Sequence, residues 1–265
     1  MKQRMSSEFI YQLFALLIAV IVVHAVYVGA IRPSAEAQIE KEMALQAAGE
    51  DYVPERSFAV VIRDFEQEAC FILLIWALAI MGYKARRAIH EQDLLGRRLL
   101  DIPEGTSVLP EDSREYSRSL EALPEAEQDY LLPRTLLSAL QRFATTGSIQ
   151  AVSDTIKESC EVESDRLDSE LSMVRYIAWA IPSVGFIGTV RGIGDALGQA
   201  YKAVEGDISG VTVSLGVAFN STFVALVLSI VIMFCLHQLQ LSQERLVLDC
   251  QRYADKRLLR FLVAH

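Results

Sequence analysis

The longest apolar stretch of this sequence runs from Val211 to Leu236 without a charged residue, and it constrains the fold more than any other feature. At a rise of 1.5 Å per residue, a helix over this stretch is longer than the ~30 Å hydrocarbon core of a bilayer. We therefore expect a transmembrane helix here. The rest of the chain has to be organised around at least one membrane span.

Three further apolar stretches extend this pattern: Phe9 to Ile31, Ala69 to Tyr83, and Ile177 to Ala196. The first is too long for a signal peptide and lacks a small-residue cleavage site, so we expect a retained anchor. The second is short for a complete span, and the apolar residues Phe58 to Ile62 just upstream are expected to extend its helix. The sequence thus predicts an all-α, polytopic membrane protein with about four transmembrane helices.

Composition supports this division into apolar and aqueous parts. The mean hydropathy is +0.27, although 22% of the residues are charged and the formal net charge is −9. Both values hold only if apolar and charged residues occupy separate blocks. Without a basic excess, nucleic-acid binding is disfavoured. The four cysteines and four histidines are scattered without metal-ligand or catalytic spacing, so we expect free thiols, no cofactor, no metal and no enzyme.

Basic residues next to the spans predict the orientation, because cytoplasmic flanks carry an excess of lysine and arginine. They precede the first span and follow the second: Lys2, Arg4, Lys84, Arg86 and Arg87. Both termini are therefore expected in the cytoplasm. The predicted organisation is two spans with an outward loop at 32–68 (residues 1–83), a cytoplasmic helical segment (84–172), a pore-forming helix pair (173–237) and a cytoplasmic helical tail (238–265).

The predicted cytoplasmic segments are amphipathic helices. Ile149, Val152, Ile156 and Cys160 share one face of a helix whose other face is acidic, and this helix is expected to run directly into the third span. The tail after the fourth span alternates leucines with basic residues in the same way. We therefore expect the last two membrane helices to be long and to extend into the cytoplasm, each with a packed face and a solvated face.

The third span carries a face of small residues. On a helical wheel this face contains Ala178, Pro182, Gly185, Thr189 and Ala196, with Gly188 and Gly192 beside it. Arg191 and Asp195 lie on the opposite side, four residues apart, where they can pair with each other. Charged residues within a membrane are costly and often functional, although a structural ion pair remains an alternative.

The fourth span has a similar face of small and hydroxyl-bearing residues: Gly210, Ser214, Ala218, Ser221, Thr222, Ala225 and Ser229. Asn220 points away from it and is expected to form a hydrogen bond between helices. Such faces allow close helix packing, and packing alone is one interpretation. The other is an ion path lined by hydroxyl groups. Neither face contains a carboxylate, so a titrating acid on such a path would come from another chain.

The segment from Ile181 to Leu197, IPSVGFIGTVRGIGDAL, resembles a signature of the MotA/TolQ/ExbB proton channel family, a proline followed by GxxGTVxGI. The segment from Gly210 to Ile230 is similar to the helix that follows this signature in the family. The resemblance covers residues 150–260. The four-span layout is closer to flagellar stators, whereas the motifs are closer to TolQ and ExbB.

The resemblance implies a subunit of a bacterial inner-membrane motor driven by protons, with sodium as an alternative ion. Five copies of such a chain form a ring around two copies of a small single-span partner like ExbD, TolR or MotB, whose aspartate carries the proton. Thr189 matches the family's threonine on the penultimate helix. The second family threonine aligns with Ala218, and Ser221 or Thr222 is expected to replace it.

The resemblance also assigns the remaining site residues. The family's acidic residue near the start of the last helix is absent, because Val213 or Ser214 stands in its place. The expected ion pathway comprises Thr189, Ser221, Thr222, Ser214 and Ala218. The expected helix or subunit interfaces comprise Arg191, Asp195, Asn220, Pro182, Gly185, Gly188 and Gly192.

Two alternatives remain open at this stage. In a membrane scaffold or signalling subunit the cytoplasmic helices would recruit partners and the spans would only pack. A solute permease is less favoured, because four spans without an inverted repeat are few. The sequence is compatible with several powered processes, namely outer-membrane uptake, envelope maintenance, motility and phage defence.

Overall fold

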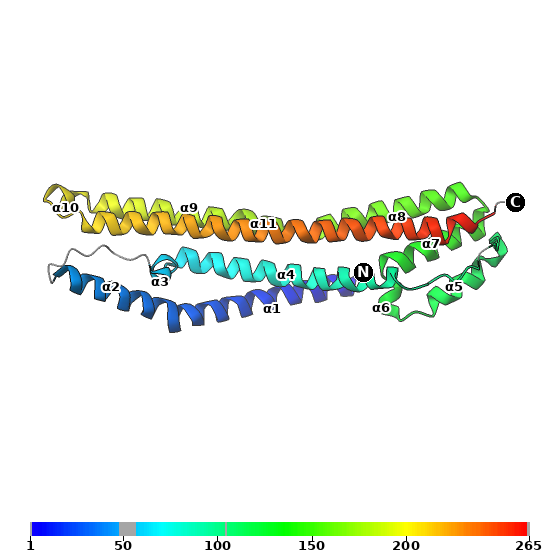
Figure 1. Ribbon diagram of the computed structural model, residues 1–265, viewed down its shortest axis with the longest axis horizontal. Helices are drawn as coiled ribbons and strands as arrows, with labels where there is room; N and C mark the ends of the chain where they lie inside the picture. The colour runs from blue at the N-terminus through cyan, green and yellow to red at the C-terminus, as the bar shows by residue number, and fades with distance from the viewer. Residues whose placement is uncertain (1, 48–56, 104, 264–265) are drawn as a thin grey trace. The chain divides into compact units, whose positions relative to one another are not determined.

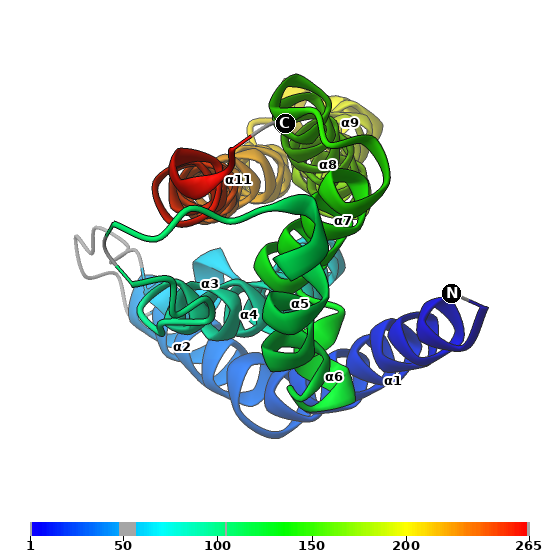
Figure 2. The ribbon, with the colours of Figure 1, turned by 90° about the vertical axis from the view of Figure 1, so that its right-hand side faces the viewer.

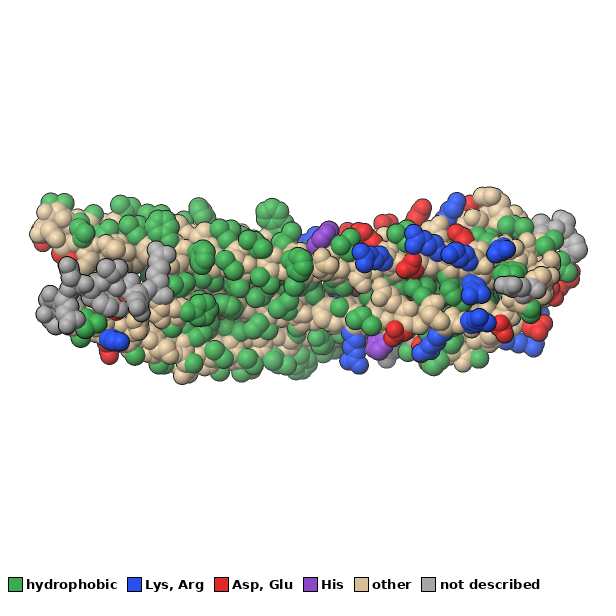
Figure 3. All heavy atoms as spheres, in the orientation of Figure 1, with side chains coloured by type: hydrophobic (Ala, Val, Ile, Leu, Met, Phe, Trp, Pro, Cys, Tyr) green, Lys and Arg blue, Asp and Glu red, His purple; other side chains and the backbone are tan. Residues whose placement is uncertain are grey.

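The computed structural model describes residues 2–47, 57–103 and 105–263. Part of the expected outward loop, residues 48–56, lies outside these ranges, as do Met1, Glu104 and residues 264–265. The chain divides into two compact units. One contains Met1–Gly82 and Met173–Leu236, and the other contains Tyr83–Ser172 and His237–His265. We call them the apolar unit and the polar unit, because hydrophobic side chains cover the visible surface of the first and charged side chains gather on the second (Figure 3).

Four helical stretches among the described residues are long and apolar enough to cross a membrane. They are Glu8–Glu42, Phe65–Leu95, Ile149–Gly198 and Ser209–Phe261. All regular elements in the described part of the chain are helices, and they are connected by turns and loops. One isolated parallel bridge joins Val108 and Leu262. The all-α fold with four candidate spans is the one that the apolar stretches predicted.

The first half of the apolar unit forms three successive helical regions. α1 (Lys2–Val26) continues through a π-helical segment (Tyr27–Ile31) into α2 (Arg32–Ala47), so the expected outward loop begins as a helix. The expectation that Phe58 to Ile62 extend the second span is wrong. They form a separate short helix, α3 (Phe58–Val61), before α4 (Phe65–Leu95) begins.

The break between α3 and α4 has a local cause. The carboxamide of Gln67 donates to the carbonyl oxygen of Val61 at 3.1 Å, so a side chain satisfies this carbonyl group at the end of α3. α4 then packs against α1 through polar as well as apolar contacts. The indole nitrogen of Trp76 donates to the backbone carbonyl of Gln12 at 2.9 Å, which is favourable because an indole N–H otherwise lacks a partner in an apolar setting.

The second half of the apolar unit is a close helix pair. α9 (Ser172–Gly198) and α11 (Ser209–Arg257) run side by side and are joined by the short helix α10 (Ala200–Val204) (Figures 1 and 2). Large side chains on their outer faces are exposed, including Trp179 at 77% and Phe219 at 68%. These outer faces suit lipid or neighbouring protein, because a soluble surface rarely exposes so many aromatic residues.

The polar unit is a bundle of shorter helices with parts of α4 and α11. Its own elements are a 3-10 turn (Pro110–Asp112), α5 (Ser113–Glu121), α6 (Glu125–Gln128), α7 (Leu131–Thr146), α8 (Ile149–Glu170) and a second 3-10 turn (Leu259–Phe261). α7 ends at Thr146 and is capped by Gly147, whose φ of 61° is a left-handed conformation that glycine adopts without strain. Ser148 then caps α8 by accepting from the amide of Ala151 at 3.3 Å. α8 ends at Glu170 and α9 begins at Ser172, so a single turn residue, Leu171, interrupts the helix that was expected to be continuous.

The core of the polar unit combines an apolar cluster with buried ion pairs. Leu136, Leu140, Phe143 and Ile156 are almost fully buried at the centre of the apolar cluster. Glu163, 2% exposed, accepts from Arg134 and Arg166 on either side. Its negative charge is therefore buried but paired, which is the arrangement that a folded interior tolerates.

Candidate functional site

The small-residue faces of α9 and α11 are packed directly against each other. A Cβ atom added to Gly192 would lie 2.7 Å from the carbonyl oxygen of Ser214 and 2.8 Å from the Cβ of Ala218. One added to Gly188 would lie 2.6 Å from the hydroxyl oxygen of Ser221. The glycines predicted at this interface therefore bring the two backbones together, and larger residues do not fit there.

Pro182 opens a hydrogen-bonding position within α9. Proline has no amide hydrogen, so the carbonyl group of Ala178, four residues earlier, loses its usual helical donor. The hydroxyl group of Ser229 on α11 donates to this carbonyl oxygen at 3.4 Å. The Cys70 thiol on α4 donates to the neighbouring carbonyl of Ile181 at 3.6 Å. The proline thus gives α11 a polar contact to the α9 backbone.

Thr189 and Thr222 form the centre of the α9–α11 interface. Their hydroxyl oxygens are in direct hydrogen-bond contact. The hydroxyl of Thr189 also lies 3.1 Å from the carbonyl oxygen of Ala218, and that of Thr222 lies 3.2 Å from the carbonyl oxygen of Gly185. Of the two predicted replacements for the second family threonine, Ser221 and Thr222, the structure places Thr222 against Thr189.

The hydroxyl pair has more acceptors than donors. Each hydroxyl group carries one hydrogen and two acceptor lone pairs, and its hydrogen can rotate to suit its neighbours. Two hydrogens are thus shared among the two hydroxyl oxygens and the carbonyl oxygens of Gly185 and Ala218. Such a pair can turn a hydrogen toward an ionised carboxylate or present a lone pair to a protonated one. This adaptability is what a path for protons requires.

The other predicted pathway residues take different positions. Ser221 is 1% exposed and donates to the carbonyl oxygen of Val217 on its own helix at 2.9 Å. Ser214 accepts from the carboxamide of Gln199 at 3.1 Å near the α9–α10 end of the unit. Ala218 contributes its backbone carbonyl. Asn220 is partly buried, and its side chain makes no hydrogen bond to the described residues. Only Thr222 is brought together with Thr189 by a side-chain contact.

Arg191 has a closer partner than the one that sequence spacing suggested. Its guanidinium group binds both carboxylate oxygens of Glu66 on α4, at 2.7 and 2.9 Å. The predicted pair with Asp195 is present but longer, at 3.8 Å. Glu66 is not among the residues that the sequence predicted for this site, because it only borders the apolar stretch Ala69 to Tyr83. An acidic residue at a span boundary was the available signal, but spacing cannot reveal a partner 125 residues away.

A second acidic residue in the first turn of α4 holds the first helical region. Glu68 has only 8% of its side chain exposed, and its two oxygens bind His24 at 2.7 Å and Arg32 at 2.5 Å. The Arg32 guanidinium also lies 4.5 Å from the centre of the Phe65 ring. Asp64 precedes α4 outside the candidate spans, and burial raises the pKa of its carboxyl group although Arg63 and Arg191 oppose the shift.

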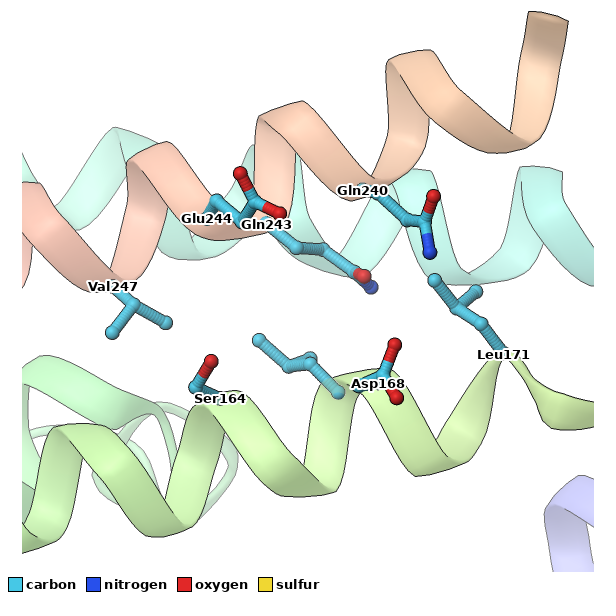
Figure 4. A pocket seen from close by; sticks show the side chains of 8 residues that line it. Ser164, Asp168, Leu171, Gln240, Gln243, Glu244 and Val247 are labelled. Atoms are coloured by element: carbon cyan, nitrogen blue, oxygen red, sulfur yellow. The ribbon is translucent and has the colours of Figure 1, made fainter.

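The polar unit contains a small hollow between α8 and α11, of about 60 Å³ (Figure 4). Its lining is Ser164, Leu167, Asp168, Leu171, Gln240, Gln243, Glu244 and Val247. The Gln243 carboxamide points into it, although this residue is only 4% exposed. This side chain makes no hydrogen bond within the part of the chain that the structure describes. The hollow therefore holds an unpartnered carboxamide beside the apolar side chains of Leu167, Leu171 and Val247.

Comparison with known proteins identifies the segment that carries this site. Residues 127–252 match the family model described as the MotA/TolQ/ExbB proton channel family, which confirms the resemblance read from the motifs. The match spans just under half of the chain and includes α7, α8, α9 and most of α11. Comparison with the curated proteins and with the solved structures finds no match.

Proposed function

We propose that this chain is the channel-forming subunit of an ion-driven motor, because residues 127–252 match the model of the MotA/TolQ/ExbB proton channel family. The family and the four apolar helices together indicate a multi-pass protein of the inner membrane. In the proposed orientation, both termini face the cytoplasm. The observation that carries the proposal is the hydroxyl pair of Thr189 and Thr222 at the centre of the matched helix pair.

The proposed assembly is a ring of five copies around two copies of a single-span partner. The partner would bring the aspartate that accepts and releases the proton. Within the described structure, the carboxylate bound to α9 is that of Glu66, and both of its oxygens are occupied by Arg191. Because the guanidinium group of Arg191 occupies both of its oxygens, Glu66 is poorly placed to take up and release a proton between α9 and α11. A carrier from another chain is therefore the simpler proposal.

In the proposed mechanism, both hydroxyl groups change their hydrogen-bond partners when the aspartate of the partner gains or loses a proton. An ionised aspartate beside them would accept their hydrogen bonds, which favours its charged form in an apolar setting. After protonation the aspartate would become a donor, and the hydroxyl groups would turn their hydrogens to the carbonyl oxygens of Gly185 and Ala218. The neutral aspartate could then move through lipid-facing surroundings. Movement of the partner relative to the ring would perform work on a target elsewhere.

Native mass spectrometry tests the assembly directly. The complex is extracted in mild detergent from its own host through a tag on this chain, so that an unidentified partner is retained. We expect five copies of this chain with two copies of a small single-span protein that carries an aspartate in its span. A monomer, or a complex with soluble proteins alone, contradicts the motor and favours the scaffold alternative.

A further inference from the structure

The Glu66–Arg191 ion pair is a charged link between α4 and the channel helix α9. Its geometry is bidentate, with nitrogen–oxygen distances of 2.7 and 2.9 Å. The Glu66 side chain is 11% exposed and that of Arg191 is 42% exposed. Bidentate arginine–carboxylate pairs fix both distance and orientation, because two parallel hydrogen bonds are made at once.

The Glu66–Arg191 ion pair lies close to the turn of α9 that carries Thr189. The Cγ atom of Glu66 lies 3.1 Å from the place where a Cβ atom on Gly188 would be. Gly188 also faces the hydroxyl group of Ser221, so this bare backbone position is enclosed by α4 on one side and α11 on the other. The next residue is Thr189. The acidic side chain from α4 therefore reaches the turn of α9 that carries the pathway threonine.

Rotation of α9 would affect both contacts together. Arg191 follows Thr189 by two residues, which places the two side chains about 200° apart around the helix axis. One faces Glu66 on α4 while the other faces Thr222 on α11. A rotation that withdraws the Thr189 hydroxyl from α11 must also pull the guanidinium group away from Glu66.

The first turn of α4 is itself held from the other side. Glu68, two residues after Glu66, is bound by His24 of α1 and Arg32 of α2. The first turn of α4 therefore bonds to α9 through one carboxylate and to the first helical region through the other. α4 lies outside the family match, which begins at residue 127. The part of the chain beyond the match thus supplies a fixed point for the channel helix.

We infer that Glu66 is a positioning residue, whose bidentate pair with Arg191 sets the rotation of α9 and keeps Thr189 against Thr222. The effect of Glu66 on ion flow rests on the proposed function, because only there are the two hydroxyl groups part of an ion pathway. The effect of Glu66 on the rotation of α9 does not depend on that function. It can be measured in the membrane without the partner and without ion flow.

Disulfide formation between introduced cysteines reports the position of α9. Side chains whose hydroxyl oxygens touch are close enough for a disulfide after replacement, so the T189C/T222C chain should cross-link rapidly under a mild oxidant in isolated membranes. We expect Glu66→Gln in this background to slow cross-linking by about tenfold, because the charged link that fixes the rotation is lost. The exchanged pair E66R/R191E should restore the rate. The chains with T189C alone and T222C alone give the background from the native cysteines.

The matched control is Asp195→Asn. It removes the longer and more exposed partner of Arg191, at 3.8 Å, and should leave the cross-linking rate unchanged. Arg191→Lys provides a second test if the Glu66→Gln chain does not accumulate. Lysine retains the charge but cannot make the bidentate contact, so cross-linking should again be slower. Cross-linking at the original rate in chains with Glu66→Gln or Arg191→Lys would overturn the inference.

A flux measurement separates this inference from the proposed function. The tagged complex is reconstituted into vesicles, and proton uptake is followed for Thr189→Val and for Glu66→Gln. Slow cross-linking with Glu66→Gln together with normal flux in Thr189→Val would retain the positioning role and reject the ion pathway. Loss of flux in Thr189→Val with unaltered cross-linking in Glu66→Gln would retain the pathway and reject the positioning role.

Discussion

The hydroxyl oxygens of Thr189 and Thr222 are in hydrogen-bond contact across the interface of α9 and α11. This contact identifies which hydroxyl of α11 faces the threonine of the family signature. The aligned position, Ala218, offers only its backbone carbonyl oxygen, which lies 3.1 Å from the Thr189 hydroxyl. The hydroxyl group that contacts Thr189 belongs to Thr222, one helical turn later.

Replacement of either threonine by valine should abolish proton flux and leave the assembly intact. Valine has nearly the same shape as threonine but lacks the hydroxyl group, so it removes the shared hydrogen bonds from the α9–α11 interface. For Thr189→Val and for Thr222→Val we expect the flux through reconstituted complexes to fall by about a hundredfold, within the range for lost groups in proton-transfer steps. Native mass spectrometry of the same samples checks the assembly.

Thr212→Val is the matched control for these two changes. Thr212 is exposed, and among the described residues its hydroxyl group bonds only to the carbonyl oxygen of Ile208, at 3.0 Å. This variant should conduct normally. Flux equal to that of the unchanged chain in all three variants would exclude the hydroxyl pair from the pathway. The same loss of flux in all three variants would show a general effect of removing threonines.

Replacement of a glycine of α9 by alanine should change the stability of the helix pair only where the glycine faces α11. An added methyl group at Gly192 meets backbone atoms of α11 at 2.7 and 2.8 Å, whereas none lies within 4 Å of the same group at Gly194. We expect Gly192→Ala to destabilise the helix pair by about 2 kcal/mol, because backbone atoms cannot move aside as side chains do. Gly194→Ala should be neutral or slightly stabilising, since alanine favours helix. Thermal unfolding of the purified protein in detergent measures both, and similar melting temperatures would contradict the packing.

The small-residue faces were predictable from the sequence, whereas some contacts of α4 were not. The spans and the small-residue faces follow from hydropathy and helical periodicity, because both depend on residues close together in the chain. The separate helix α3 and the Glu66–Arg191 pair do not follow from these patterns. The first depends on a side-chain contact from Gln67, and the second depends on how α4 packs against α9. Tertiary packing selects such partners, and local spacing instead favoured Asp195.

Loss of the buried carboxylate in the polar unit should destabilise that unit locally. Glu163 is 2% exposed and binds Arg134 and Arg166, whose side chains remain 43% and 33% exposed. Glu163→Ala leaves both guanidinium groups without this partner, but their exposure to water moderates the penalty. We expect a loss of about 2 kcal/mol, below the usual range for a fully buried pair. Faster amide hydrogen exchange in α7 and α8 is the measurement.

Asp249→Ala provides the comparison for this change. Asp249 pairs with Arg252 three residues later, and both side chains are more than half exposed. Such a surface pair contributes little, so exchange in α7 and α8 should be unaffected. If Glu163→Ala also leaves exchange in these helices unchanged, the buried ion cluster does not stabilise the bundle.

Replacement of Gln243 by methionine should stabilise the polar unit. The Gln243 side chain is 4% exposed and points into the hollow between α8 and α11, where its carboxamide has no hydrogen-bond partner among the described residues (Figure 4). Methionine has a similar length and adapts to irregular spaces, so it can replace an unpartnered carboxamide by apolar contacts to the lining of the hollow. We expect Gln243→Met to stabilise the unit by about 1 kcal/mol, measured as slower hydrogen exchange in α8 and α11. Gln240→Met, at a more exposed position in the same lining, should change exchange little. A destabilised Gln243→Met variant would mean that the carboxamide has a partner in the assembled protein, such as an ordered water molecule or a group from a neighbouring subunit.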